Sequence, residues 1–267
     1  MKVNQYYKAA TLEDAYKVFI DEPGNAILGG GLWLKKINGP INKLVDLNGL
    51  GLDFINETSE EIIIGAMTTL RHMETHPSII NLGQGFLSKA SGSIMGVALR
   101  NMVTIGGCLA GKYPFSDIIT PLLTLDVSLS FFPDRTIDLP SYLQETGKLK
   151  TILTKITIKK RNLNGFFKKI SVTPLDFAIL NMAISAFKGD IRIAVGSRPG
   201  VGQLAIEASK FLSNNSQITE DDIQKATEMI LKEITFLSTN AASAEYRIAL
   251  AKAHIKRGLM EVLTYES

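Results

Sequence analysis

The spacing of apolar residues near the start of the chain predicts an amphipathic helix. Apolar side chains recur at helical spacing over residues 12–19, which is the pattern of a helix that packs against a core. The preceding Thr11-Leu12-Glu13-Asp14 has the form of a capping box. Pro23-Gly24 cannot continue a helix, so we expect this one to end near Asp21.

Short strands and further helices are predicted along the rest of the chain. Runs that alternate between apolar and polar residues, or that stay apolar for only a few positions, indicate strands, and longer runs with helical spacing indicate helices. The predicted strands cover residues 26–28, 43–47, 61–66, 103–105, 127–132, 136–139, 151–158, 166–172, 177–187 and 191–195. A helix capped by Thr68 or Thr69 is expected to end at His76-Pro77, and further helices are predicted over residues 82–100, 116–123, 203–212, 219–236 and 241–263.

The order of these elements divides the chain into two regions. The polar stretch at residues 159–165 marks a plausible boundary. Beyond it, three strands are followed by helices, which is typical of α+β packing. We therefore expect the second region to be an α+β structure of its own.

Two stretches in which a predicted strand runs into glycines are the clearest candidates for function. Residues 26–32 read Ala-Ile-Leu-Gly-Gly-Gly-Leu, and residues 103–111 read Val-Thr-Ile-Gly-Gly-Cys-Leu-Ala-Gly. Glycine lets main chain approach a ligand closely, and successive main-chain N–H groups form concavities that bind anions. Two such turns predict two loops that close on one phosphate-rich ligand. Two tight turns without a ligand are the alternative.

Composition and charge narrow the class of protein. The 267 residues, 45% of them hydrophobic and 21% charged, suit a folded protein with a sizeable core. A net charge of +3, with no basic run denser than Lys159-Lys160-Arg161, argues against a nucleic-acid partner. The polar N-terminal segment and the lack of any run of about 18 apolar residues predict a cytoplasmic protein that does not enter a membrane.

The single cysteine and the three histidines limit the metal and redox chemistry. Cys108 alone cannot supply the four thiolates of an iron–sulfur cluster. His72 and His76 could share a helix face, but no further donor lies near them, so no metal site is predicted. Any redox chemistry of this chain must therefore use a bound organic cofactor.

The segment from Gly106 to Lys112 nearly matches the phosphate-binding loop of nucleoside triphosphatases. Tyr113 stands where that loop needs Ser or Thr to hold Mg²⁺. Pro114 also disfavours helical backbone at Tyr113, where that loop continues into a helix. A P-loop-like nucleotide-binding protein that uses Gly106–Lys112 is therefore the second hypothesis.

Motifs spread over nearly the whole chain match those of one family. Residues 100–110 read Arg-Asn-Met-Val-Thr-Ile-Gly-Gly-Cys-Leu-Ala, and residues 64–70 read Ile-Gly-Ala-Met-Thr-Thr-Leu. Further matches are Leu28-Gly29-Gly30-Gly31, Phe115-Ser116-Asp117, residues 121–126 and Ser243-Ala244-Glu245-Tyr246-Arg247. In these motifs the chain resembles the FAD-binding medium subunits of the molybdenum hydroxylases, the xanthine dehydrogenase and carbon monoxide dehydrogenase family.

The resemblance implies an α+β fold and FAD as the cofactor. The implied architecture is a two-lobed FAD-binding domain of the PCMH type over residues 1–160, with lobes of about 1–57 and 58–160. A smaller α+β C-terminal domain, a three-stranded sheet with helices, would follow over residues 161–267. Cofactor contacts, largely through main chain, would come from Leu28, Gly29, Gly30, Gly31, Leu32, Thr104, Ile105, Gly106, Gly107 and Cys108. Asp117, Leu153 and Lys168 match flavin-side positions of the family.

The resemblance also implies an electron-transfer role in a larger complex. The partners would be a molybdopterin-binding large subunit and a [2Fe–2S] subunit, and FAD would pass electrons to NAD⁺ or another acceptor. No side chain is expected to act as an essential acid or base, so no catalytic residue is predicted. Two departures from the family pattern, Gly31 in place of Thr and Cys108 in place of Asn, keep open a structural subunit that has lost FAD.

Overall fold

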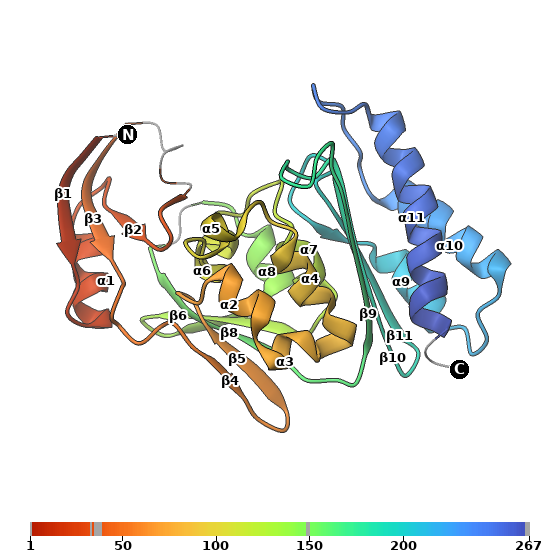
Figure 1. Cartoon of the computed structure of the whole chain (residues 1–267), viewed down its shortest axis with the longest axis horizontal. Coiled ribbons are helices and arrows are strands. Elements are labelled where there is room, and N and C mark those ends of the chain that lie inside the picture. Colours follow the sequence, from red (N-terminus) through yellow and green to blue (C-terminus); the bar gives the residue numbers. More distant parts are fainter. Residues whose placement is uncertain (1, 33, 35–38, 148–149, 265–267) are drawn as a thin grey trace. The chain divides into compact units, whose positions relative to one another are not determined.

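The chain folds into two compact units, each assembled from three segments (Figure 1). The computed structural model describes residues 2–32, 34, 39–147 and 150–264. Unit 1 comprises residues 1–72, 97–111 and 127–159, and unit 2 comprises residues 73–96, 112–126 and 160–267. The two units are described separately below.

Unit 1 begins with a small parallel sheet. Its strands lie in the order β1 (Lys2–Lys8), β3 (Pro40–Asp46) and β2 (Ala26–Leu28). Helix α1 (Leu12–Asp21) connects β1 to β2, and Thr11 caps it by accepting the Asp14 N–H at 3.1 Å. The predicted bounds of this helix are confirmed. Because the strands are parallel, the carboxyl ends of β2 and β3 lie at the same edge of the sheet.

A five-stranded antiparallel sheet forms the rest of the framework of unit 1. The predicted hairpin is confirmed as β6 (Val127–Phe132) and β7 (Arg135–Asp138), and β6 alternates buried and half-buried residues. The order is β4 (Ile55–Glu57), β5 (Glu61–Gly65), β8 (Ile152–Lys159), β6 and β7. The helical elements of this part are the first residues of α2 (Leu70–Thr75), then α5 (Val97–Arg100), α6 (Ile105–Ala110) and α8 (Leu139–Gln144).

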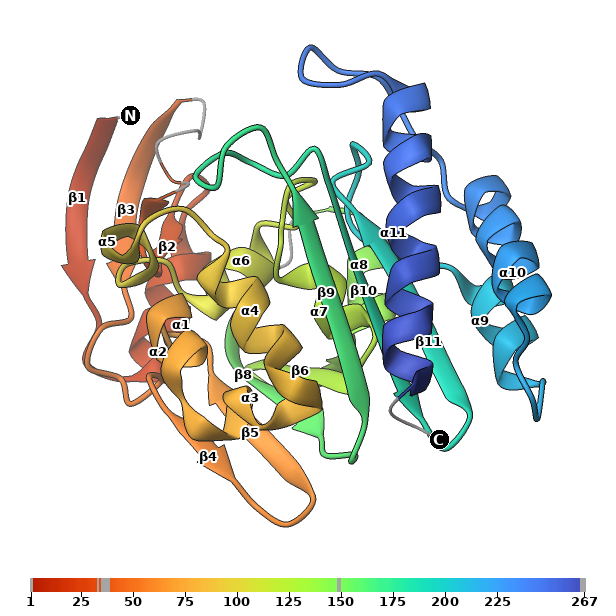
Figure 2. The same ribbon diagram turned by 45° about the vertical axis from the view of Figure 1, so that its right-hand side comes forward.

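Unit 2 is built on an antiparallel sheet with helices on both faces. The three strands predicted for the second region form it, and a two-residue strand extends one edge. The order is β12 (Gln203–Leu204), β11 (Asp190–Gly196), β10 (Leu180–Phe187) and β9 (Asn164–Ile170). One face packs against α9 (Ile206–Ser213), α10 (Glu220–Glu233) and α11 (Ala244–Thr264), as Figure 2 shows. The other face meets α4 (Phe86–Gly92) and α7 (Ile119–Leu123), near α3 (Pro77–Ile80).

Several helix predictions were wrong in extent, and the helix expected from residue 116 begins only at Ile119. Residues 82–100 do not form one helix, because Gly83, Gln84 and Gly85 adopt left-handed backbone in the short 3₁₀ segment η2 (Leu82–Gly85), and Met95 does so again before α5. The helix expected at 203–212 begins only at Ile206, because residues 203–204 pair with β11. Among the described residues, no helix is long and apolar enough to cross a membrane.

Candidate cofactor site

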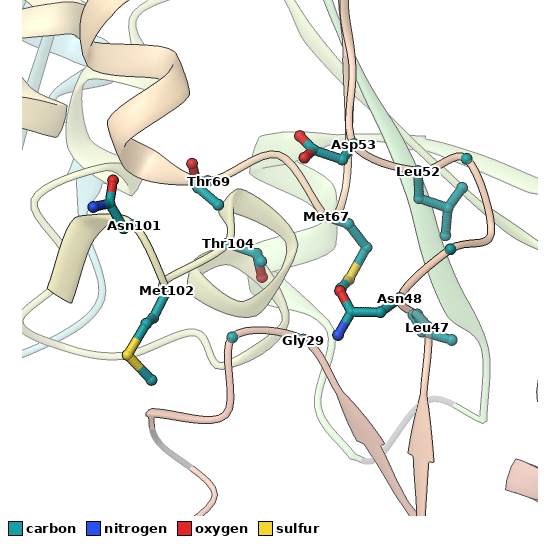
Figure 3. Close-up of a pocket in the computed structure, with 13 residues that line it drawn as sticks. Gly29, Leu47, Asn48, Leu52, Asp53, Met67, Thr69, Asn101, Met102 and Thr104 are labelled. Carbon is teal, nitrogen blue, oxygen red and sulfur yellow. The ribbon is translucent and has the colours of Figure 1, made fainter. Parts of the chain in front are cut away.

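A cavity of about 590 Å³ opens in unit 1 at the carboxyl ends of β2 and β3 (Figure 3). Ligands of open sheets with parallel strands commonly bind outside the carboxyl ends of the strands. The volume is in the range of pockets that hold small molecules and cofactors. The described lining residues are Gly29, Gly30, Leu47, Asn48, Gly49, Gly51, Leu52, Asp53, Met67, Thr69, Asn101, Met102 and Thr104.

The two predicted glycine stretches meet beside this cavity. A Cβ atom on Gly29 would lie 2.8 Å from the Thr104 Oγ1, and one on Gly30 would overlap the carbonyl oxygen of Met102. These two glycines therefore let one loop seat directly against the other. The sequence predicts that these glycines let the main chain approach a ligand. In the structure they also let the two loops approach each other closely.

The second glycine stretch is a helix start, which corrects the strand expected at residues 103–105. Thr104 makes only an isolated bridge with Thr69 and then caps α6 by accepting the Gly107 N–H at 3.2 Å. The N–H groups of Ile105 and Gly106 donate to the carbonyl oxygens of Thr68 and Ala66, both at 2.9 Å. A residue with a side chain cannot replace Gly106, because its Cβ would lie 2.6 Å from the Ala66 carbonyl oxygen. These N–H groups are thus engaged within the protein.

The first glycine loop keeps its main-chain donors available. Among the described residues, no hydrogen bond engages the N–H groups of Gly29 and Gly30. Asn48 and Asn101 line the cavity, and their side-chain amides form no hydrogen bond to another described residue. Main-chain donors suit a pyrophosphate, and amides suit the polar groups of a nucleotide. The donor set of the cavity therefore fits the diphosphate and sugar parts of FAD.

Only three of the residues predicted to hold the cofactor line the cavity: Gly29, Gly30 and Thr104. Cys108 is buried, which suits a small packing residue. The remaining predicted members of the two stretches are Leu28, Gly31, Leu32, Ile105, Gly106 and Gly107, which flank the lining residues in the chain. Leu153 is buried on β8, opposite Phe131.

The largest part of the lining was not predicted. Six of the thirteen lining residues belong to the loop from Leu47 to Asp53, which follows β3. The sequence predicts a strand at residues 43–47, and no function is predicted for the loop that follows it. The loop could have been found from its position after a strand that pairs in parallel with β2. The carboxyl ends of parallel strands lie at the same edge of the sheet, so the two loops that follow them reach one site. Parallel pairing itself was not predicted.

Asp117 lies in unit 2 within a buried polar cluster. Its side chain is 5% exposed and forms an ion pair at 3.3 Å with Lys169, which is 8% exposed. The Asn181 amide donates to the Asp117 Oδ1 at 2.5 Å, and the Asn181 Oδ1 accepts from the Thr120 hydroxyl at 2.7 Å. Burial raises the pKa of Asp117 above its ordinary value, while Lys169 and Asn181 act in the opposite direction.

Lys168, the predicted flavin-side cation, lies on the opposite face of the sheet from this cluster. Lys168 is aligned with Met182, a core residue beneath α9–α11, whereas Lys169 is aligned with Asn181. Adjacent side chains of a strand point to opposite faces. The pKa of His254 on α11 is lowered by burial and then by the positive charges of Lys168 and Arg257, as this placement requires. The structure thus brings Lys169, not Lys168, to Asp117.

The P-loop hypothesis does not agree with the backbone. In that motif the glycine loop precedes a helix that begins at the lysine. Here Gly106 and Gly107 lie inside α6, and Lys112 follows the helix with a left-handed φ of 43°. Lys112 therefore does not stand at a helix start, and this alternative is not favoured.

Two family models match this chain, one for each of its two regions. Residues 1–159 match the family described as the FAD binding domain in molybdopterin dehydrogenase. The chain belongs to this family. Residues 165–262 match the CO dehydrogenase flavoprotein C-terminal domain. The predicted family, the α+β fold class and the cofactor are confirmed: this is an FAD-binding subunit of a molybdenum hydroxylase-type oxidoreductase.

Individual relatives match over almost their full length. The chain is 24% identical over 278 residues to the nicotine 6-hydroxylase medium subunit of Paenarthrobacter nicotinovorans, covering 96% of each chain. It is 23% identical over 282 residues to the xanthine dehydrogenase FAD-binding subunit of Escherichia coli O157:H7, covering 97% of this chain and 95% of the relative.

Solved structures show the same fold. A chain of carbon monoxide dehydrogenase from Hydrogenophaga pseudoflava superposes with a TM-score of 0.88 at 21% identity, covering 97% of both chains. A chain of quinoline 2-oxidoreductase from Pseudomonas putida 86 gives a TM-score of 0.85 at 23% identity, covering 97% of this chain and 96% of the other.

Proposed function

We propose that this FAD-binding subunit receives electrons from [2Fe–2S] clusters on a partner chain and delivers them to NAD⁺ or another acceptor. In this proposal a molybdopterin-binding large subunit completes the complex. The cysteine count supports placing the clusters on a partner chain, because one cysteine cannot hold a cluster. The names of the relatives, which are medium or FAD-binding subunits, support it as well. The proposal requires a compartment that supplies NAD⁺, and we place the protein in the cytoplasm.

The observation that carries the proposal is the cavity at the ends of β2 and β3, closed by the Gly29–Gly30 loop against the Met102–Thr104 segment. When bound, FAD supplies the ability to accept electrons one or two at a time and to release a pair as hydride. In this arrangement the residues of the chain bind and orient the cofactor and exclude water from it. They need not exchange protons with a substrate.

We assign the two predicted glycine stretches to this site. The N–H groups of the first glycine loop would hold the diphosphate, and the Thr104 segment would support that loop from behind. Asp117, Leu153 and Lys168 stay proposed flavin-side residues, with Asp117 acting as an ion pair with Lys169. The division into a FAD-binding domain over residues 1–160 and a C-terminal domain over residues 161–267 is part of the same proposal.

Anaerobic half-reactions test the proposed electron path. The holoprotein, purified with its partner chains, is reduced chemically without oxygen and then mixed with NAD⁺. We expect the visible flavin absorption to return while NADH forms, one NADH for each electron pair that leaves the flavin and the clusters that feed it. Reoxidation by an artificial acceptor but not by NAD⁺ would move the assignment to another acceptor. Failure of the flavin to take electrons from the reduced clusters of the partner would overturn the electron-transfer role.

A further inference from the structure

The loop from Leu47 to Asp53 has the features of a recognition element for one end of the cofactor. It supplies more of the described cavity lining than either glycine stretch. Asp53 is the carboxylate among the described lining residues. A carboxylate repels phosphate and accepts hydrogen bonds from hydroxyl groups, and acidic side chains that follow the strands of nucleotide-binding sheets bind ribose hydroxyls in this way.

The groups that attract an anion and the carboxylate that repels one therefore lie on different loops of the cavity. The donors of Gly29 and Gly30, on the loop after β2, favour an anion, whereas Asp53, on the loop after β3, disfavours one. The Oδ1 of Asp53 lies 3.6 Å from the Nδ1 of His72, which leaves Oδ2 for a ligand. A cofactor with a diphosphate in its middle and a ribose at one end can bind the N–H groups through its phosphates and the carboxylate through its hydroxyl groups.

A hydrogen-bonded chain holds the start of this loop. The side chain of Asp46, the last residue of β3, is 5% exposed. Its Oδ1 accepts the Asn48 N–H at 2.9 Å, and its Oδ2 accepts the Tyr6 hydroxyl at 2.5 Å. Asp46 does not line the cavity, while Asn48 does. Asp46 and Tyr6 thus act on the cavity through the loop they orient.

We propose that Asp53 binds the ribose hydroxyls of the AMP half of FAD, and that Asp46 and Tyr6 are positioning residues for the loop that carries it. The inference rests on the proposed binding of FAD in this cavity. It assigns the AMP half to the β3 loop and the diphosphate to the β2 loop. The opposite orientation, with the AMP half away from Asp53, is the outcome that the test below is built to detect.

The test compares FAD with FMN, which lacks the AMP half, as ligands of the flavin-free protein. Asp53→Asn removes the charge of a side chain that is 61% exposed, so folding is not at risk. We expect the Kd for FAD to rise about tenfold and the Kd for FMN to stay within about twofold. Tyr6→Phe is expected to raise the Kd for FAD about threefold, again without effect on FMN.

Tyr7→Phe is the matched control. Tyr7 is the next residue of β1, and its hydroxyl donates to the Asp14 Oδ1 on α1 at 2.8 Å rather than to Asp46. We expect no change in the Kd for either flavin. An unchanged Kd for FAD in Asp53→Asn, or an equal loss for FAD and FMN, would overturn the inference while leaving the proposed function intact. A wild-type protein that binds no FAD would overturn both.

Discussion

The cavity of unit 1 is built mainly from main chain, whereas the polar cluster of unit 2 is built from side chains. In unit 1, glycines let two loops touch and leave N–H groups facing a cavity. In unit 2, Asp117 comes from one segment, Lys169 and Asn181 come from two strands of another, and the three side chains meet in a buried place. The first kind of site leaves a local mark in the sequence, because only glycine permits such contacts. The second kind of site, made of side chains from separate elements, leaves no such local mark in the sequence.

The side-chain cluster of unit 2 also forms hydrogen bonds to several other parts of that unit. Lys169 donates to the Ser93 carbonyl oxygen at 2.9 Å as well as pairing with Asp117. Asn181 donates to the Ser197 hydroxyl at 3.1 Å. Arg247, which belongs to the C-terminal motif, donates to the carbonyl oxygens of Ser197 and Ile179. The comparison therefore predicts large stability effects in unit 2 and large binding effects in unit 1.

The largest expected effect on stability is that of Lys169→Met. This change leaves the Asp117 carboxylate buried without its cation, and breaking a buried pair in this way costs about 3–5 kcal/mol. Urea unfolding of the flavin-loaded protein measures it. The double variant Lys169→Met, Asp117→Asn removes both charges and is expected to recover most of the loss. A loss below about 1 kcal/mol in the single variant would show that the cluster does not stabilise unit 2.

Gly30→Ala is expected to have the largest effect on flavin binding. The added methyl group overlaps the Met102 carbonyl oxygen, so the two loops must separate. Overpacking of this kind costs about 1–3 kcal/mol in stability, and we expect FAD affinity to fall at least about tenfold. Gly96→Ala is the control, because its Cβ meets nothing within 4 Å and its φ is not left-handed. Titration of the flavin-free variants with FAD measures the difference, and equal affinities would contradict the packing argument.

A smaller effect is expected in the pH dependence of unfolding. Because the pKa of Asp117 is raised in the folded state, the folded protein binds a proton that the unfolded chain has already released. The resulting stability is present below the ordinary pKa of 3.8 and is lost as pH rises through the raised value. Asp117→Asn should remove this fall. The free energy of unfolding of both proteins is compared from pH 4 upward, and parallel curves would contradict the raised pKa.

The smallest expected effect is that of Lys112→Met. The P-loop hypothesis requires this lysine and Mg²⁺ for nucleotide binding. Because Lys112 does not begin a helix, we expect the flavin content of the variant to equal that of the wild type, with or without EDTA. A loss of nucleotide binding in this variant, together with a requirement for Mg²⁺ in the wild type, would support the P-loop hypothesis.

Local sequence patterns correctly predicted the helices and strands that neighbouring residues determine. The capping residue Thr11 and the Pro23-Gly24 stop bound α1 correctly, and alternation found β6, β7 and the strands of unit 2. The break in residues 82–100 was not predictable in this way. Gln84 and Met95 adopt left-handed backbone although neither is glycine, and the Gln84 side chain is hydrogen-bonded to Asn164 and Gly165, which are distant in the sequence.

The candidate site divides along the same line. The glycine loops were predicted because glycine is required where Gly30 meets Met102, whatever the rest of the fold does. The loop from Leu47 to Asp53 was missed because its place depends on the parallel pairing of β2 with β3. That Lys169 pairs with Asp117 could not be predicted without the strand register, since one step along a strand reverses the face.

The most direct test of the central claim is the visible absorption spectrum of the purified chain, followed by chromatography of the flavin released on heating. The wild-type protein is predicted to show flavin bands and to release FAD rather than FMN. The Gly30→Ala protein, prepared in parallel, is predicted to contain less of it. A wild-type chain that is colourless, and that takes up no added FAD alone or with its partner chains, would contradict the claim that the cavity at the ends of β2 and β3 holds FAD.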